Sequence, residues 1–364
     1  MKKILILANF HLGLYNFRKE LIASLMEKGH EVYISLPYGP LVENLKEMGC
    51  RFYDTELERR GLNPFKDLKL MKDYTRLIKE IKPHLVITYT IKPNIYGGMA
   101  CRLAGIPYMA NITGLGTAFQ KEGPLKELIK VLYRLSLKKA RAVLFENIGN
   151  KEVFLQNSIL DDSRCRVMNG AGVNIDEYCY TPLPERQMIN FLFIGRIMKE
   201  KGVDELFKAA SKIKSEYENV QFSVVGPFED HYENKVKELE QEGIIRFHGY
   251  QKDVKPFVKG THCFVLPSYH EGMANTLLEC AAMGRPLIAS DINGCREAVI
   301  DGENGFLCSA GDWDSLYVKM KQFIELPHEK KIQMGISSRV RAEDCFDRKK
   351  VVSKTLDIID DIRW

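Results

Sequence analysis

Short apolar runs alternate with longer segments of helical period along the first half of the chain. Seven runs have the pattern of buried strands, at 3–8, 31–36, 51–53, 85–88, 108–112, 142–146 and 166–168. Between them, 16–28 keeps apolar residues at helical spacing and ends at Gly29, and a longer helical segment opens at Asn63-Pro64 and closes at Pro83. Strands that alternate with helices predict repeated βα units and a parallel sheet.

A Pro-containing, aperiodic stretch between Asn174 and Asn190 interrupts this pattern, and the alternation then restarts. The second half has strand patterns at 190–194, 221–225, 245–248, 262–266 and 286–289, and helical ones at 203–217, 229–240 and 275–283. We predict an α/β protein with two doubly wound, Rossmann-like domains, 1–180 and 181–345, facing each other across a cleft. The terminal segment 346–364 has helical period and is expected to pack back on the first domain.

Composition agrees with a soluble globular protein of two domains. Of the chain's residues, 45% are hydrophobic and 28% are charged. The length of 364 residues exceeds what a single hydrophobic core usually holds. A net charge of +5 is too nearly balanced to predict nucleic-acid binding. The nine cysteines have no metal-ligand spacing, so we expect them to be free thiols. The apolar run at 4–8 is too short for a secretory signal, so we expect the protein to be cytoplasmic.

The strongest candidate chemistry lies between 267 and 291. A buried strand ends at Leu266, a loop with Gly272 follows, and a helix opens near Ala274. Free amides at a helix start suit a diphosphate or sugar hydroxyls. Glu271 in the loop and Glu279 two turns into the helix can contact different parts of one elongated ligand. For an isolated pair of Glu residues, a helix cap and a solvated surface charge would be the simpler interpretation, but the apolar helix face around Glu279 argues against it.

A second motif follows the first strand of the second half. Gly195 permits a tight turn, Arg196 supplies a planar fork for phosphate oxygens, and Lys201 places a point charge at the start of the next helix. Taken alone, such a basic loop is more often a solvated turn. Together with Glu271 and Glu279, it predicts a site for an anionic, sugar-containing ligand.

The two motifs together resemble those of the retaining glycosyltransferases of family four, which have the GT-B fold. The resemblance covers 191–307 and includes Gly-Arg-Pro-Leu-Ile at 284–288 and Gly-Glu-Asn-Gly-Phe at 302–306. It implies that Arg196 and Lys201 hold the donor diphosphate, Glu271 contacts the donor sugar and Glu279 holds the ribose hydroxyls. We therefore expect Arg196, Lys201 and Glu271 to be the catalytic residues.

The same resemblance implies the remaining donor contacts. We expect them from Gly13, Gly195, Tyr250, Val254, Gly272, Met273, Ala274, Asn275 and Thr276. The stretch 249–254 resembles the one that borders the nucleobase, and Met273-Ala274 stands where many family members have x-Pro. The family's mechanism needs no metal and no covalent intermediate, because the leaving diphosphate itself helps to deprotonate the acceptor. Electrostatic stabilisation of that diphosphate would then supply most of the catalysis.

Loops of the first domain are the candidate acceptor site. These segments, 9–18, 88–94 and 111–117, each follow a predicted strand. They resemble the corresponding loops of a family-four subgroup that transfers hexosamines or uronic acids to polyprenyl-diphosphate-linked sugars. That subgroup includes N-acetylgalactosaminyltransferases acting on undecaprenyl-diphosphate-linked bacillosamine. The expected acceptor contacts are His11, Lys92, Asn111, Thr113 and Gly114. A polar loop residue and an exposed lysine are the simpler interpretations of His11 and Lys92.

The segment 121–141 has seven basic residues, two acidic residues and an apolar face. Such a segment can lie on the anionic inner leaflet of the cytoplasmic membrane. A helix packed on its own sheet with a solvated basic face needs the same amphipathic pattern, so both interpretations stay open.

The sequence thus predicts a cytoplasmic, peripheral-membrane hexosyltransferase, with a nucleotide sugar, expected to be UDP-linked, as donor and a lipid-linked saccharide as acceptor. Two alternatives are a GT-B nucleotide-sugar epimerase and a non-catalytic module that binds sugar nucleotides or membranes.

Overall fold

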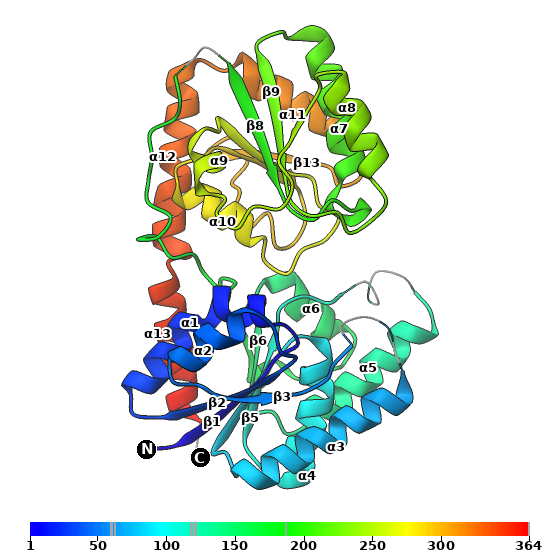
Figure 1. Cartoon of the computed structure of the whole chain (residues 1–364), viewed down its shortest axis with the longest axis vertical. Coiled ribbons are helices and arrows are strands. Elements are labelled where there is room, and N and C mark those ends of the chain that lie inside the picture. Colours follow the sequence, from blue (N-terminus) through cyan, green and yellow to red (C-terminus); the bar gives the residue numbers. More distant parts are fainter. Residues whose placement is uncertain (59–60, 62, 117–118, 120–121, 186–187, 363–364) are drawn as a thin grey trace. The chain divides into compact units, whose positions relative to one another are not determined.

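A computed structural model describes the chain except for residues 59–60, 62, 117–118, 120–121, 186–187 and 363–364. It contains two compact units (Figure 1). Unit 1 comprises Met1–Ala171 and Arg348–Trp364, and unit 2 comprises Gly172–Asp347.

Unit 1 contains a seven-stranded, fully parallel sheet in the order β3-β2-β1-β4-β5-β6-β7. Its strands are β1 (Lys3–Leu7), β2 (Glu31–Leu36), β3 (Arg51–Asp54), β4 (Leu85–Tyr89), β5 (Tyr108–Ile112), β6 (Ala142–Phe145) and β7 (Cys165–Val167). Its α-helices are α1 (His11–Glu27), α2 (Leu41–Glu47), α3 (Pro64–Ile81), α4 (Gly98–Ala104), α5 (Pro124–Leu137), α6 (Ile148–Gln156) and α13 (Arg348–Asp361). A π-helical turn, Pro93–Gly97, precedes α4.

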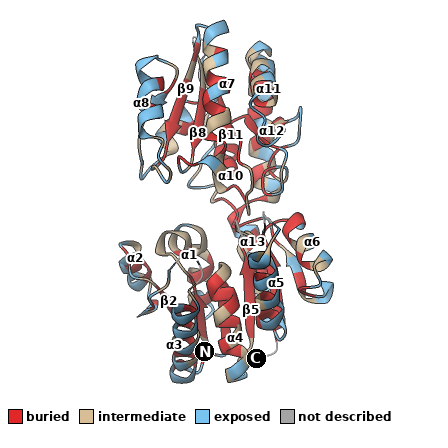
Figure 2. Ribbon diagram, turned by 90° about the vertical axis from the view of Figure 1, so that its right-hand side faces the viewer, coloured by how far each residue is buried: buried red, intermediate tan, exposed pale blue. Residues whose placement is uncertain are grey.

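Alternate residues of the central strand β1 pack into different cores. Leu5 and Leu7 join the core under α3, α4 and α5, whereas Ile4 and Ile6 join the core under α1 and α13. Side chains of a strand point alternately to the two faces of its sheet, so both faces of a sheet between helices are apolar. This explains why the strand read as a continuous apolar run. Figure 2 shows the resulting distribution, with buried residues along the strands and the inner sides of the helices.

Unit 2 repeats the architecture with six parallel strands in the order β10-β9-β8-β11-β12-β13. Its strands are β8 (Ile189–Ile194), β9 (Val220–Val225), β10 (Arg246–Phe247), β11 (Cys263–Leu266), β12 (Leu287–Ser290) and β13 (Gly305–Cys308). Its helices are α7 (Val203–Glu216), α8 (Glu233–Gln241), α9 (Lys255–Lys259), α10 (Asn275–Ala282), α11 (Trp313–Glu325) and α12 (His328–Cys345). The predicted fold class, two doubly wound Rossmann-like domains, is confirmed.

The division between the units falls after Ala171, earlier than the predicted boundary after residue 180. Residues 172–180 go with unit 2 because a partly buried arginine of α12 holds the segment. Arg339 donates hydrogen bonds to the carbonyls of Ile175 (3.3 Å) and Tyr178 (3.0 Å). The terminal helix α13 belongs to unit 1, where Val351 and Ile359 are buried against the core that includes α1.

Helix α3 shows how local sequence sets a helix start. Asn63 caps it, and its side chain accepts hydrogen bonds from the backbone N–H groups of Phe65 and Lys66. The buried face of this helix includes Leu70, whereas Leu68 is 47% exposed. Among the described helices, none is long and apolar enough to cross a membrane. All nine cysteines are free thiols.

Candidate active site

The candidate site in unit 2 lies where the strand order reverses. Doubly wound sheets bind ligands at this point, beyond the carboxyl ends of the strands. In unit 2 the reversal falls between β8 and β11, which are neighbours in the sheet. The loops that follow these two strands are 195–202 and 267–274, which carry both motifs singled out in the sequence. Tertiary structure therefore brings together two segments that are about 70 residues apart in the chain.

Glycines let these loops approach one another closely. Gly202 has a φ of +69°, and a Cβ there would lie 2.0 Å from the carbonyl oxygen of Pro267. Gly294, in the loop after β12, has a φ of +87°, and a Cβ there would lie 2.8 Å from the Cβ of Glu271. Any larger residue would push the neighbouring loop away. The position of Glu271 is thus set by backbone packing on both sides.

The two motifs meet in an ion pair between Lys201 and Glu271. The Lys201 Nζ lies 2.5 Å from Glu271 Oε1, and the two side chains are 20% and 12% exposed. The Ser268 hydroxyl donates a 2.7 Å hydrogen bond to the same carboxylate oxygen. A cation and a carboxylate are therefore held together at the ligand-binding edge of the sheet.

Arg196 is more open than this pair. Its guanidinium lies 3.5 Å from Glu229, and its side chain is 43% exposed. His270 is a neighbouring group that sequence reasoning did not select, although it stands within the same loop. Burial lowers the pKa of His270, so its imidazole is neutral at neutral pH. The charges of Lys201 and Arg196 both act on His270, so the two loops lie close enough to influence one another electrostatically.

The start of α10 contributes differently from what the sequence predicts. Met273 and Ala274 are buried in the core, and the Ala274 N–H donates to the carbonyl of Gly294 at 3.0 Å. Ala274 therefore shapes the turn and offers neither its side chain nor its amide to a ligand. Asn275 and Thr276 are partly exposed, and Asn275 Oδ1 has no hydrogen-bond partner within the described part of the chain.

Glu279 lies about one turn into α10 and contacts Tyr178. Burial and the nearby Glu279 carboxylate, which forms a hydrogen bond with the phenol, raise the pKa of Tyr178. Glu279 is therefore not a free surface charge, and Tyr178 is a partner that the sequence did not reveal. The predicted base-bordering residues Tyr250 and Val254 both precede α9; Tyr250 is 62% exposed, and Val254 is the residue just before this helix.

In unit 1, Gly13 lies in the first turn of α1 and not in a loop. A Cβ added to Gly13 would meet no atom within 4 Å, so the protein's own packing does not require a glycine there. His11 begins the same helix, and its ring packs against Gly39, where a Cβ would lie 2.0 Å from Cδ2. The predicted loop before this helix is thus shorter than expected, because α1 begins at His11 and not at Asn16.

Two of the predicted acceptor residues are engaged inside unit 1. Lys92 is 8% exposed and lies 2.8 Å from the buried Asp67 carboxylate, so its ammonium is not an open phosphate ligand. Asn111 is 5% exposed, and its carbonyl accepts a 2.8 Å hydrogen bond from Asn94. Their neighbours Thr113 and Gly114 lie just beyond the carboxyl end of β5 and are partly exposed. Sequence alone did not show that Asp67 is buried beside Lys92.

A buried pair missed in the sequence joins α1 to β6. Arg18 lies 2.7 Å from Glu146, and its guanidinium stacks over the Tyr89 ring at 4.8 Å. Burial raises the pKa of Glu146, and the Arg18 charge opposes that shift. Tyr89 ends β4 and Glu146 directly follows β6, so Arg18 of α1 joins two strand ends at the edge of the sheet from which Thr113 emerges.

No group of three or more His, Cys, Asp and Glu side chains that could hold a metal ion occurs among the residues that the structure describes. An Asp-x-Asp spacing does occur at 312–314, where Asp312 caps α11. Its carboxylate accepts hydrogen bonds of 3.0 Å from the backbone N–H groups of Asp314 and Ser315.

Comparison with known families decides the class. The model "Glycosyl transferases group 1" matches residues 183–341, and "Glycosyl transferase 4-like" matches residues 3–147. The chain belongs to the glycosyltransferases. Each matched range lies wholly within one of the two units, so the loops around Lys201 and Glu271 belong to the group 1 domain of this glycosyltransferase. The epimerase and the non-catalytic module are thereby disfavoured.

Curated relatives resemble the glycosyltransferase over nearly its whole length. An N,N'-diacetylbacillosaminyl-diphospho-undecaprenol alpha-1,3-N-acetylgalactosaminyltransferase of Campylobacter jejuni is 26% identical, with 96% of each chain covered. A UDP-Gal:alpha-D-GlcNAc-diphosphoundecaprenol alpha-1,3-galactosyltransferase of Escherichia coli is 27% identical, with 89% of this chain and 87% of the relative covered.

Solved structures share the fold. A glycosyltransferase from Rickettsia africae matches with a TM-score of 0.81 at 20% identity, covering 99% of both chains. Anabaena HepE, solved in complex with UDP and glucose, matches with a TM-score of 0.82 at 17% identity, covering 100% of both chains. The two parallel-sheet domains of this glycosyltransferase are therefore those of the GT-B fold.

Proposed function

We propose that this glycosyltransferase moves a sugar, an N-acetylhexosamine or a related hexose, from a UDP-sugar to a polyprenyl-diphosphate-linked saccharide, with retention and without a metal ion. The observation that carries the proposal is the Lys201–Glu271 pair at the strand-order reversal of unit 2, with Arg196 beside it. The reaction takes place on the cytoplasmic side of a bacterial membrane, in the assembly of a surface polysaccharide or glycan.

The division of labour follows from charge. Lys201 and Arg196 supply positive charge for the diphosphate, which becomes more negative as the sugar departs, and such electrostatic stabilisation is usually the largest catalytic contribution. Glu271 offers an acceptor for sugar hydroxyls, and Glu279 one for the ribose. In the free protein Lys201 is bound to Glu271, so donor binding redistributes the contacts of the ammonium between the carboxylate and the diphosphate.

Three features support the substrate classes. The E. coli relative is named for UDP-Gal, and both relatives are named for diphospho-undecaprenol-linked acceptors. Both names also specify alpha linkages, which a retaining transfer from an alpha-linked nucleotide sugar would give. In unit 1, Thr113 and Gly114 are the accessible candidates for acceptor contact, and we no longer propose Lys92 for this role.

The first test is a thermal-shift panel with UDP, GDP, ADP and their sugar conjugates, with and without EDTA. A ligand that binds the native state raises the melting temperature by mass action. We expect a shift with UDP or a UDP-sugar that EDTA leaves unchanged. A shift with another nucleotide, or one abolished by EDTA, would contradict the donor class or the metal independence.

The second test is transfer itself. Purified protein is incubated with UDP-N-acetylgalactosamine or UDP-galactose and with undecaprenyl-diphosphate-linked saccharides, and the lipid products are analysed by mass spectrometry. We expect one hexose or N-acetylhexosamine to be added to the lipid-linked saccharide. UDP binding without transfer to any lipid-linked saccharide would refute the acceptor assignment and leave the donor assignment intact.

A further inference from the structure

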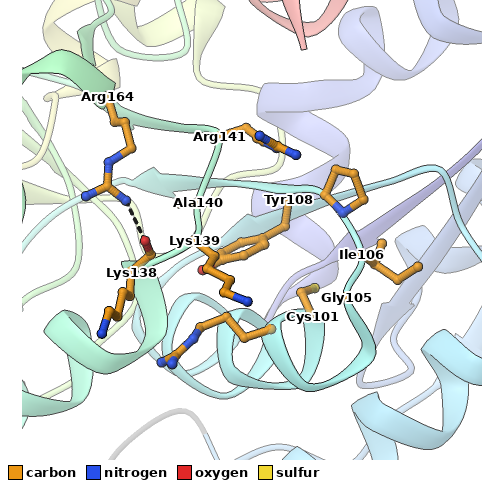
Figure 3. Close-up of a pocket in the computed structure, with 11 residues that line it drawn as sticks. Cys101, Gly105, Ile106, Tyr108, Lys138, Lys139, Ala140, Arg141 and Arg164 are labelled. Carbon is orange, nitrogen blue, oxygen red and sulfur yellow. Dashed lines mark hydrogen bonds between the residues drawn. The ribbon is translucent and has the colours of Figure 1, made fainter. Parts of the chain in front are cut away.

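A basic pocket of about 630 Å³ opens at the amino-terminal edge of the sheet in unit 1. It lies where β5 and β6 begin, so it is at the opposite edge from the loops that carry Thr113 and Gly114. Five of its eleven lining residues are basic and none is acidic; the basic ones are Arg102, Lys138, Lys139, Arg141 and Arg164 (Figure 3). Nothing in the proposed transfer reaction uses this pocket.

Two of the five cations build the wall. Arg164 donates hydrogen bonds to the carbonyls of Leu137 (3.0 Å) and Lys138 (2.9 Å) at the end of α5, and it pairs with Asp161. Arg102 donates to the carbonyl of Leu135 in the last turn of the same helix. These contacts satisfy carbonyl groups that a helix end leaves without partners. They also fix the position of the loop that follows α5.

The other three cations have no such role. Lys138, Lys139 and Arg141 are exposed, and their side chains form no ion pair or hydrogen bond with another described residue. Their backbone is nevertheless held, since the Arg141 N–H donates to the carbonyl of Tyr108 at 2.9 Å. In Figure 3 the Lys139 side chain lies beside the Tyr108 ring. Three like charges on one fixed loop repel each other unless an anion lies between them.

The surface next to the pocket is apolar. Helix α5 exposes an aliphatic stripe, defined as Leu125, Leu128, Val131 and Leu135, whose members are 44–48% exposed. Leu103, adjacent to Arg102, is 71% exposed. A patch of this kind marks an interaction surface.

The lysines of α5 do not form a solvated basic face. Lys126 and Lys130 are only 14% and 12% exposed, and they pair with Glu122 and Glu127. Arg134 is held by the carbonyls of Ser158 and Asn157. The cations of the segment 121–141 whose side chains have no partner within the described part of the chain are therefore those at the pocket, Lys138, Lys139 and Arg141. Lys121 lies outside the described residues.

We propose that the pocket binds the phosphate of an anionic phospholipid headgroup, while the aliphatic stripe of α5 contacts the acyl region beside it. A free phosphate ion would explain the basic pocket but not the adjoining stripe, and an apolar partner would explain the stripe but not the unpaired cations. The proposal rests on the proposed function, which places the enzyme at a membrane, and it identifies the face that touches the lipid.

The test is binding to phosphatidylcholine vesicles with and without phosphatidylglycerol, measured by co-sedimentation of the full chain. A Lys or Arg near an anionic surface contributes about fivefold in affinity, so Lys139→Gln/Arg141→Gln should weaken binding to phosphatidylglycerol vesicles about thirtyfold. The control, Lys72→Gln/Lys79→Gln, removes two exposed cations from α3 and should change binding no more than twofold. Leu128→Ser should also weaken binding, through the stripe.

Three results would overturn the proposal. Equal losses in the two double variants would show a general effect of net charge. Unchanged binding in Lys139→Gln/Arg141→Gln would remove the pocket from the interaction. Displacement of vesicles by millimolar inorganic phosphate would identify a free-phosphate site. The UDP thermal shift serves as the independent readout, because it reports on unit 2; loss of that shift with vesicle binding intact would count against the proposed function alone.

Discussion

Replacement of Lys201 by methionine tests the centre of the proposed site. The substitution keeps the length of the side chain and removes its charge, so the Glu271 carboxylate keeps only the Ser268 hydroxyl as a described side-chain partner. Lys199 is the matched control, because it lies on the same short 3₁₀ turn (Lys199–Lys201) and is exposed. If the charge of Lys201 serves the donor diphosphate, Lys201→Met and Lys199→Met should differ sharply.

The expected magnitude follows from the contact. A hydrogen bond to a charged group contributes about 1.5–3 kcal/mol, which corresponds to roughly 10- to 150-fold in affinity. Lys201→Met should therefore weaken UDP binding by that factor and lower transfer at least as much. Because the pair is partly exposed, we expect a loss of only about 1–2 kcal/mol in the free energy of unfolding.

The opposite substitution gives a different result. In Glu271→Gln the ammonium of Lys201 loses its carboxylate partner, so it is available to the diphosphate. UDP should bind Glu271→Gln at least as tightly as the wild type, whereas transfer should fall by two orders of magnitude or more, since the sugar loses its charged acceptor.

Both variants are measured by isothermal titration with UDP, by the transfer assay and by urea unfolding. Equal UDP affinities for Lys201→Met, Lys199→Met and the wild type would refute the diphosphate role of Lys201. A parallel loss of UDP affinity in Glu271→Gln would show that the pair acts as one structural unit, contrary to the division of labour proposed for it.

Three further changes probe the framework. Gly202→Ala should lower the free energy of unfolding, measured in urea, by about 2–4 kcal/mol, because the added Cβ would clash with the backbone. Gly243 has the same φ of +69° but open space around it, so Gly243→Ala should cost about 1 kcal/mol, and equal losses in the two variants would exclude the clash. Burial lowers the pKa of His262, so on acidification the imidazole of the unfolded chain is protonated before that of the folded protein, and the free energy of unfolding falls below pH 6.5 by up to about 1.4 kcal/mol per pH unit. His262→Asn should flatten this slope between about pH 7 and 5, and an unchanged slope would exclude His262 as its source. Lys92→Met should destabilise unit 1 by about 3–5 kcal/mol, because Asp67 is left buried without its cation, and adding Asp67→Asn to the same chain should restore most of the lost stability. Normal stability of Lys92→Met together with lost transfer would instead favour an acceptor role for Lys92.

The sequence by itself determined the elements and the class of fold. Strands of a parallel sheet between two layers of helices are buried on both faces, so β1, β4 and β11 contain the apolar runs 4–7, 85–87 and 263–266. Caps such as Asn63 mark helix starts through contacts within one turn. The donor motif was also readable, because its glycines and charges occur at short, fixed spacings around Arg196 and Glu271.

Only the tertiary structure decided which polar groups are available. Lys92 looked open in the sequence, but Asp67 lies beside it because α3 packs next to the turn after β4. The boundary between the units falls after Ala171, because Arg339 of α12 binds the carbonyls of Ile175 and Tyr178, more than 160 residues earlier in the sequence. In the segment 121–141, the pairing of Lys126 and Lys130 with glutamates left the charge at the basic pocket. Local pattern fixes which residues form a strand or a helix, whereas ion pairing and burial depend on neighbours that are distant in sequence, and these are defined only when the chain has folded.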